Sequence, residues 1–211
     1  MTIDQDFILS QQIEDLLVSR NLRGMKSVQP ALTPGYYLRA AKKLSACKGN
    51  VFISTGFPVN NTFETDGPVG AIALYRVLEA TGSTPILVCG SPLASALRCD
   101  YRTHELAVGQ REGAEYQATI DLAVFEPELI ITIELPGQAE DGCYYNMRGE
   151  DISPYTIFFD DYVRQANCPV VSIGDGGNEL GMGNLSGALS TLDIIPCATR
   201  CDELVIADVS N

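Results

Sequence analysis

The stretch from Val170 to Gly183 reads VVSIGDGGNELGMG, and it predicts both the fold and the place of a functional site. The β-branched run at its start is typical of a buried strand, and the glycines after it are typical of a tight loop. Asp175 and Asn178 add side-chain oxygens to the backbone N–H groups of such a loop. We therefore expect a buried parallel strand that ends in a ligand-binding loop, with a plain strand-to-helix turn as the alternative.

The same pattern of a short apolar run followed by a polar loop recurs along the chain. Further strands are predicted at 51–55, 84–89, 104–108, 129–133 and 203–208, and helices at 4–19, 36–46, 69–80, 114–123 and 153–166. This alternation predicts an α/β fold: a mostly parallel sheet with helices on both faces, in a Rossmann-like three-layer architecture. Because only three residues follow position 208, we expect a chain cut short of a C-terminal helix.

Length and charge narrow the class of protein. A chain of 211 residues predicts one α/β domain over 1–211, with 1–48 as a helical part packed on it. The net charge of −13 argues against nucleic acid and anionic membranes as partners. Seven cysteines without a CxxC pair favour a reducing compartment, the cytoplasm or, in a eukaryote, the mitochondrial matrix. We interpret Arg20, Arg23 and Lys26 as a solvent-exposed basic face.

Polar residues follow the predicted strands, and ligands of parallel sheets bind beyond the carboxyl ends of the strands. The residues placed there are Glu64, Asp66, Glu134, Arg148, Asp175, Asn178 and Asp208. Clustered carboxylates either bind a divalent cation such as Mg²⁺ or Mn²⁺, with Asp66 and Asp175 as candidate ligands, or divide acid and base roles. His104 is the only histidine and has no evident partner, so we place it on the surface.

Three long motifs carry a resemblance to a known family. They are TGF at 55–57 with ETDGPVGA at 64–71, IELPG at 133–137 with YYNMRG at 144–149, and GDGGNE at 174–179 with GMG at 181–183. In this order, and from about residue 45 to the end, the chain resembles the glutamate-cyclase-like family. It departs from the family pattern at Leu135, where a basic residue often follows the acid.

The resemblance implies a lyase that dehydrates D-glutamate, a small acidic amino acid, to 5-oxo-D-proline. The candidate catalytic residues are Glu64, Asp66, Glu134 and Asp175. The candidate substrate-binding residues are Thr55, Gly56, Asn146, Arg148, Gly176, Gly177, Asn178 and Glu179. We expect no nucleotide and no pyridoxal phosphate, because there is no GxxxxGK run and no lysine after Lys48. We allow for a homo-oligomer.

Two alternatives remain open. The first is a non-catalytic binding module that holds a small acidic metabolite at the same edge of the sheet. The second is a Mg²⁺-dependent haloacid-dehalogenase-like phosphatase, because GDGGNE at 174–179 resembles the metal-binding loop of that family. The phosphatase ranks lower, because Asp160 and Asp161 lack the Asp-x-Asp spacing of its nucleophile motif.

Overall fold

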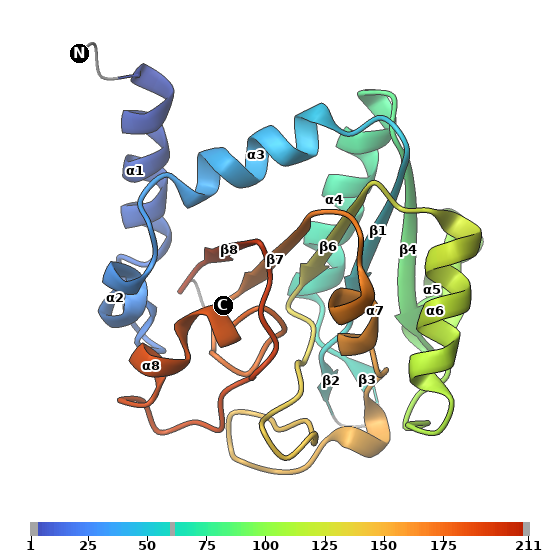
Figure 1. Ribbon diagram of the computed structural model, residues 1–211. Helices are drawn as coiled ribbons and strands as arrows, with labels where there is room; N and C mark the ends of the chain where they lie inside the picture. Colours follow the sequence, from blue (N-terminus) through green and yellow to red (C-terminus); the bar gives the residue numbers. More distant parts are fainter. Residues whose placement is uncertain (1–3, 60–61, 209–211) are drawn as a thin grey trace.

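The computed structural model describes residues 4–59 and 62–208, and its centre is a parallel sheet of six strands (Figure 1). The strands are β1 (Asn50–Thr55), β4 (Thr84–Gly90), β5 (Thr103–Leu106), β6 (Leu129–Ile133), β7 (Val170–Gly174) and β8 (Glu203–Ile206). They lie side by side in the order β5-β4-β1-β6-β7-β8, and every neighbouring pair is parallel. The predicted parallel sheet is confirmed.

The strand order places a crevice at the middle of the sheet. The chain moves outward from β1 through β4 to β5, returns to the centre at β6, and then moves the other way through β7 to β8. The connections that leave β1 and β6 therefore diverge above the same edge. In open α/β sheets this switch point, outside the carboxyl ends of the strands, is where ligands bind.

Helices cover both faces of the sheet, which confirms the predicted three-layer architecture. On one face lie α3 (Tyr36–Ala46), α4 (Asp66–Ala80) and α5 (Leu93–Leu97), and on the other lie α6 (Ala114–Phe125) and α7 (Asp160–Gln165). Each face of the sheet has its own hydrophobic core, and successive residues of β1 point into opposite cores. Ile53 packs against the first set of helices and Phe52 against the second. The apolar runs of the sequence are thus buried on both sides.

The first helix does not bury the face that its apolar residues predict. Helix α1 (Gln5–Leu17) leaves Leu9 and Leu16 exposed and buries Glu14. The Glu14 carboxylate accepts the backbone N–H groups of Gly35 and Tyr37, each at 3.1 Å, at the start of α3. A carboxylate that caps a neighbouring helix therefore decides which face of α1 is buried.

The helix predicted over 153–166 is wrong. The structure has a short 3-10 helix η2 (Ser153–Tyr155), then extended chain, and only then α7. Asp160 begins α7 and is fully buried, because its carboxylate accepts the Gln138 N–H at 3.0 Å and the Tyr144 hydroxyl at 2.7 Å. This contact ties α7 to the long loop after β6, and it interrupts what would otherwise be one helix.

His104 also differs from its predicted place on the surface without a partner. Its side chain is about three-quarters buried, and its Nε2 lies 2.7 Å from Asp121 Oδ2 on α6. The remaining elements are α2 (Met25–Val28), η1 (Gln29–Ala31), the hairpin of β2 (Pro58–Val59) and β3 (Thr62–Phe63), η3 (Gly183–Leu185) and α8 (Ser186–Leu189). Among the described helices, none is long and apolar enough to cross a membrane.

Candidate functional site

A cleft of about 570 Å³ opens at the switch point of the sheet. Its walls come from the loops after β1, β6 and β7 and from the segment before α2. Six of the residues predicted from sequence line it: Glu64, Glu134, Asn146, Arg148, Asn178 and Glu179. The cleft also contains residues that were not predicted, among them Arg23, Phe57, Met147 and Tyr155.

Glu134 lies at the centre of this site. It follows β6 directly, and its backbone adopts a left-handed conformation with φ of 48°. Its N–H donates to the Ile173 carbonyl at 2.9 Å, which fixes the turn. Burial, with the neighbouring carboxylates of Asp175 and Glu179, raises the pKa of Glu134 to about 8. A non-glycine residue in this conformation with a raised pKa is typical of functional sites.

Glu64 and Asp66 join Glu134 in a carboxylate cluster. One oxygen from each of the three side chains lies within 4.8 Å of the others. Burial and the nearby Asp66 raise the pKa of Glu64 above its usual range. Three converging carboxylates are suitable oxygen ligands for a divalent cation. The cluster contains Asp66, one of the two predicted metal ligands, but not Asp175, which pairs with an arginine instead.

The first turn of α4 lies directly against the switch point, and Gly67 makes this approach possible. A Cβ atom added at Gly67 would lie 2.6 Å from Thr55 Oγ1 and 3.1 Å from Glu134 Cβ. A glycine at this position therefore lets the helix contact the ends of β1 and β6 at once. The contact holds Asp66, the first residue of α4, beside Glu134.

Replacing Gly67 with alanine is expected to destabilise the protein by about 1–3 kcal/mol, because the added methyl group must push α4 away from the strand ends. Gly187→Ala is the matched control, because a Cβ added at Gly187 would meet no atom within 4 Å. Urea unfolding of both variants measures the difference. Equal stability of the two variants would contradict the proposed close approach.

The loop after β7 is organised by Glu179. Its carboxylate accepts the backbone N–H groups of Gly176 at 2.8 Å and Gly177 at 2.7 Å. Burial and the adjacent Asp175 raise the pKa of Glu179 to about 7. The N–H groups predicted to face a substrate are thus bound by a side chain of the same loop. Asn178 donates to the Tyr145 carbonyl at 2.7 Å, and within the described residues its buried Oδ1 has no partner.

Arg23 belongs to the site, so its assignment to a solvent-exposed face was wrong. Its guanidinium forms an ion pair with Asp175. Its backbone N–H donates to the buried Asp208 carboxylate at 2.9 Å, and Met25 N–H donates to the same group at 3.0 Å. Burial lowers the Arg23 pKa, but Asp175, Glu179 and Glu134 outweigh this effect and raise it. Asp208, predicted at the binding edge, thus anchors the segment that brings Arg23 into the cleft.

Arg148 provides a second cation. Asn146 Oδ1 accepts the N–H groups of Arg148 at 2.9 Å and Glu150 at 3.0 Å, so the Asn146 side chain shapes the loop that carries Arg148. The Glu150 carboxylate accepts from Asn146 Nδ2 at 2.6 Å. Over the described ranges, the Arg148 guanidinium forms no ion pair. It lines the cleft and can meet an anionic ligand.

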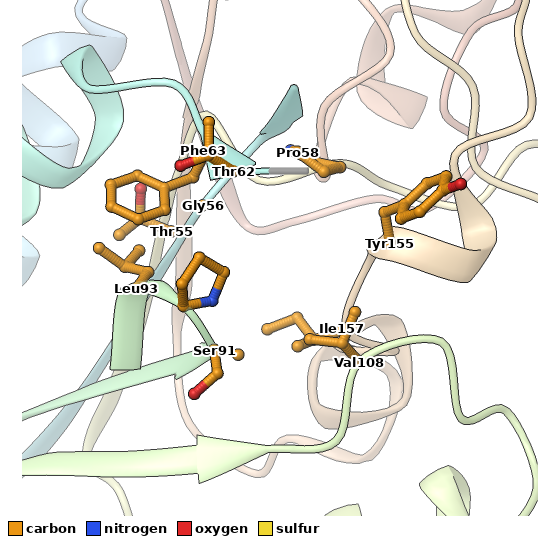
Figure 2. Close-up of a pocket in the computed structure, with 12 residues that line it drawn as sticks. Thr55, Gly56, Pro58, Thr62, Phe63, Ser91, Leu93, Val108, Tyr155 and Ile157 are labelled. Carbon is orange, nitrogen blue, oxygen red and sulfur yellow. The ribbon is translucent and has the colours of Figure 1, made fainter. Parts of the chain in front are cut away.

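Thr55 and Gly56 line a second, smaller cavity of about 170 Å³ (Figure 2). This cavity lies at the ends of β1 and β4, and Pro58 and Tyr155 line both it and the larger cleft. The Thr55 hydroxyl is buried and has no hydrogen-bond partner in the part of the chain that the structure describes. Thr55 and Gly56, two of the eight residues predicted to bind substrate, thus line the cavity beside the cleft rather than the cleft itself.

The fold and the site define a class: an α/β protein with a cleft lined by charged residues at the switch point of a parallel sheet, where such sheets commonly bind ligands. Residues 13–211 match the family described as D-glutamate cyclase-like, C-terminal, and the chain belongs to this family. It is 29% identical to the human protein named D-glutamate cyclase, mitochondrial, over 215 residues. The match covers 89% of this chain and 35% of the human protein, so the chain spans about a third of that relative's length.

Proposed function

We propose that this chain is a lyase that converts D-glutamate to 5-oxo-D-proline, the activity that the name of its human relative indicates for that protein. The observation that carries the proposal is one cleft with groups of both charges. Glu64, Glu134 and Glu179 line it together with Arg23 and Arg148. D-Glutamate has one ammonium and two carboxylate groups, so it needs partners of both kinds.

The reaction requires the substrate amine to lose a proton and attack the side-chain carboxyl carbon, after which a carboxyl oxygen leaves as water. The two arginines are suited to bind the substrate carboxylates and to offset the repulsion from a protein of net charge −13. The unpartnered Asn178 Oδ1 is suited to accept from the substrate ammonium. When no cation is bound, the raised pKa of Glu134 suits it to donate a proton to the departing oxygen.

The carboxylate cluster of Glu64, Asp66 and Glu134 fits a divalent cation. The Asp66 carboxylate contributes to raising the pKa of Glu64 and of Glu134, and a cation would relieve that repulsion. Such an ion would supply charge neutralisation at the substrate's reacting carboxylate. Because the ligands must lose protons to bind it, cation binding at neutral pH is expected to release protons.

The reducing compartment predicted from sequence remains part of the proposal. The seven cysteines are all free, which fits the cytoplasm or the mitochondrial matrix. The human relative is named as mitochondrial.

Incubation with D-glutamate or L-glutamate, followed by proton NMR, tests this function. We expect 5-oxoproline from D-glutamate only, with faster formation when Mn²⁺ or Mg²⁺ is added. Glu64→Gln is expected to raise the Mn²⁺ concentration needed for half-maximal stimulation about 10–100-fold, because the variant removes one of three ligands. Glu79→Gln, an exposed change on α4, should leave that concentration unchanged. Binding of D-glutamate without product would instead favour the non-catalytic binding module.

A further inference from the structure

The smaller cavity beside the cleft has an apolar lining that the dehydration of D-glutamate does not use. Phe63 from β3, Leu93 from α5, Val108 and Ile157 contribute apolar side chains to its wall, and Thr55 lies at the end of β1 beside them (Figure 2). The groups that act on free glutamate are charged, and the molecule that leaves is water. An apolar wall stabilises neither. The cavity therefore fits a chemical group that D-glutamate itself lacks.

The size of the cavity fits one compact apolar group. Its volume is about 170 Å³, and an apolar protein cavity of about 150 Å³ is known to hold benzene. A whole amino acid with its charged groups belongs in the larger cleft, where the arginines and carboxylates lie. The smaller cavity has room for a substituent of that amino acid, about the size of a phenyl ring.

The cavity and the carboxylate cluster lie next to each other. Pro58 and Tyr155 line both the cavity and the cleft. Thr55 and Glu134 meet at Gly67, since a Cβ added there would lie 2.6 Å from Thr55 Oγ1 and 3.1 Å from Glu134 Cβ. A molecule held in the cleft with its side-chain carbonyl near Glu134 therefore needs only a short extension to enter the cavity.

We propose that the cavity binds the leaving group of a γ-amide of D-glutamate, and that the chain cyclises such amides when the amine carries a compact apolar group. The inference rests on the proposed function, because it uses the same ring closure. The substituent on the side-chain carbonyl is the part that departs, so it alone extends away from the cleft. Thr55 lines the cavity, and its buried hydroxyl, which has no partner within the described residues, lies against the first turn of α4 at Gly67.

The step is balanced without a further reactant. The substrate nitrogen forms a bond to the side-chain carbonyl carbon, and the bond from that carbon to the amide nitrogen breaks. The attacking amino group gives up one proton and the departing amine gains one. The products are 5-oxo-D-proline and a free amine, and neither water nor a redox partner is consumed.

The test compares γ-D-glutamyl anilide, γ-D-glutamylglycine and D-glutamate, with formation of 5-oxoproline followed by NMR. The anilide is expected to react at least about tenfold faster than the glycine amide, because the cavity buries a phenyl ring but not a carboxylate. Val108→Trp enlarges a side chain that lines the cavity, and Val124→Trp places the same residue on the exposed side of α6 as a control. Val108→Trp should slow the anilide about tenfold and leave D-glutamate turnover unchanged.

The other outcomes overturn the proposal or separate it from the proposed function. Turnover of D-glutamate without turnover of the anilide overturns it, and so does an anilide rate that Val108→Trp does not change. If neither compound is consumed, the proposed function fails. Saturation-transfer NMR of the anilide ring then shows whether the cavity binds the ring. The subsite stands if ring contacts seen in the original chain are lost in Val108→Trp but kept in Val124→Trp, and it falls if no ring contact is seen.

Discussion

Replacing Glu134 with glutamine is expected to lower the rate of 5-oxoproline formation by about 10²–10⁴-fold. The amide keeps the shape of the side chain, but it can neither transfer a proton nor offer a charged ligand to a cation. Glu134 is held at the switch point by a left-handed turn at φ of 48°, so no neighbouring acid can easily take its place. Glu79→Gln on α4 is the matched control. Full turnover by Glu134→Gln would remove Glu134 from the mechanism.

The same variant also tests the raised pKa of Glu134. A carboxyl group with a folded-state pKa of about 8, above its usual 4.5, favours the folded state at low pH, and this contribution is lost as the pH rises through 8. Glutamine does not titrate, so Glu134→Gln should gain stability relative to the original chain between about pH 5 and pH 8.5. Thermal unfolding at a series of pH values measures this gain. A stability difference that does not change with pH would contradict the raised pKa.

Replacing Arg23 with glutamine is expected to raise the KM for D-glutamate about 10–100-fold, because the variant loses a cation that lines the cleft. It should also lower the free energy of unfolding by about 2 kcal/mol, because Asp175 is left as a buried charge without its partner. A third of the Arg23 side chain is exposed, so the loss is smaller than for a fully buried pair. Steady-state kinetics and urea unfolding measure the two effects.

A double variant separates the two roles of Arg23. Adding Asp175→Asn to Arg23→Gln removes the unpaired charge, so stability should recover while the KM stays high. Arg20→Gln is the control, because Arg20 is exposed three residues earlier in the chain. An unchanged KM in Arg23→Gln would show that Arg23 only holds the loop after β7 in place.

Much of the fold could be predicted from the sequence because local patterns decide it. The helix at 36–46 and the strand at 129–133 have the predicted bounds, since each is set by an uninterrupted apolar pattern. The buried face of α1 and the break after Tyr155 could not be predicted this way. Each depends on a buried carboxylate, Glu14 or Asp160, whose partners are distant in sequence.

The candidate site was predictable only in part. The rule that ligands bind beyond strand ends predicts Glu64, Glu134 and Asn178 at one edge of the sheet, and all three line the cleft. Arg23 precedes the first strand, and its partner Asp175 lies 152 positions away, so no local spacing connects them. The glycine after it, Gly24, has a φ of 90° and turns the chain at this point. A glycine next to one of the few cations of an acidic chain was the sequence signal that could have identified Arg23 as a site residue.

Oxygen labelling tests whether the chain dehydrates D-glutamate within one molecule. D-Glutamate carrying ¹⁸O at both oxygens of its side-chain carboxylate is incubated with the protein, and the product is analysed by mass spectrometry. Intramolecular dehydration predicts 5-oxo-D-proline that retains one ¹⁸O, in the lactam carbonyl, while the other leaves as water. Absence of 5-oxoproline, or a product that has lost both labelled oxygens, would contradict the account.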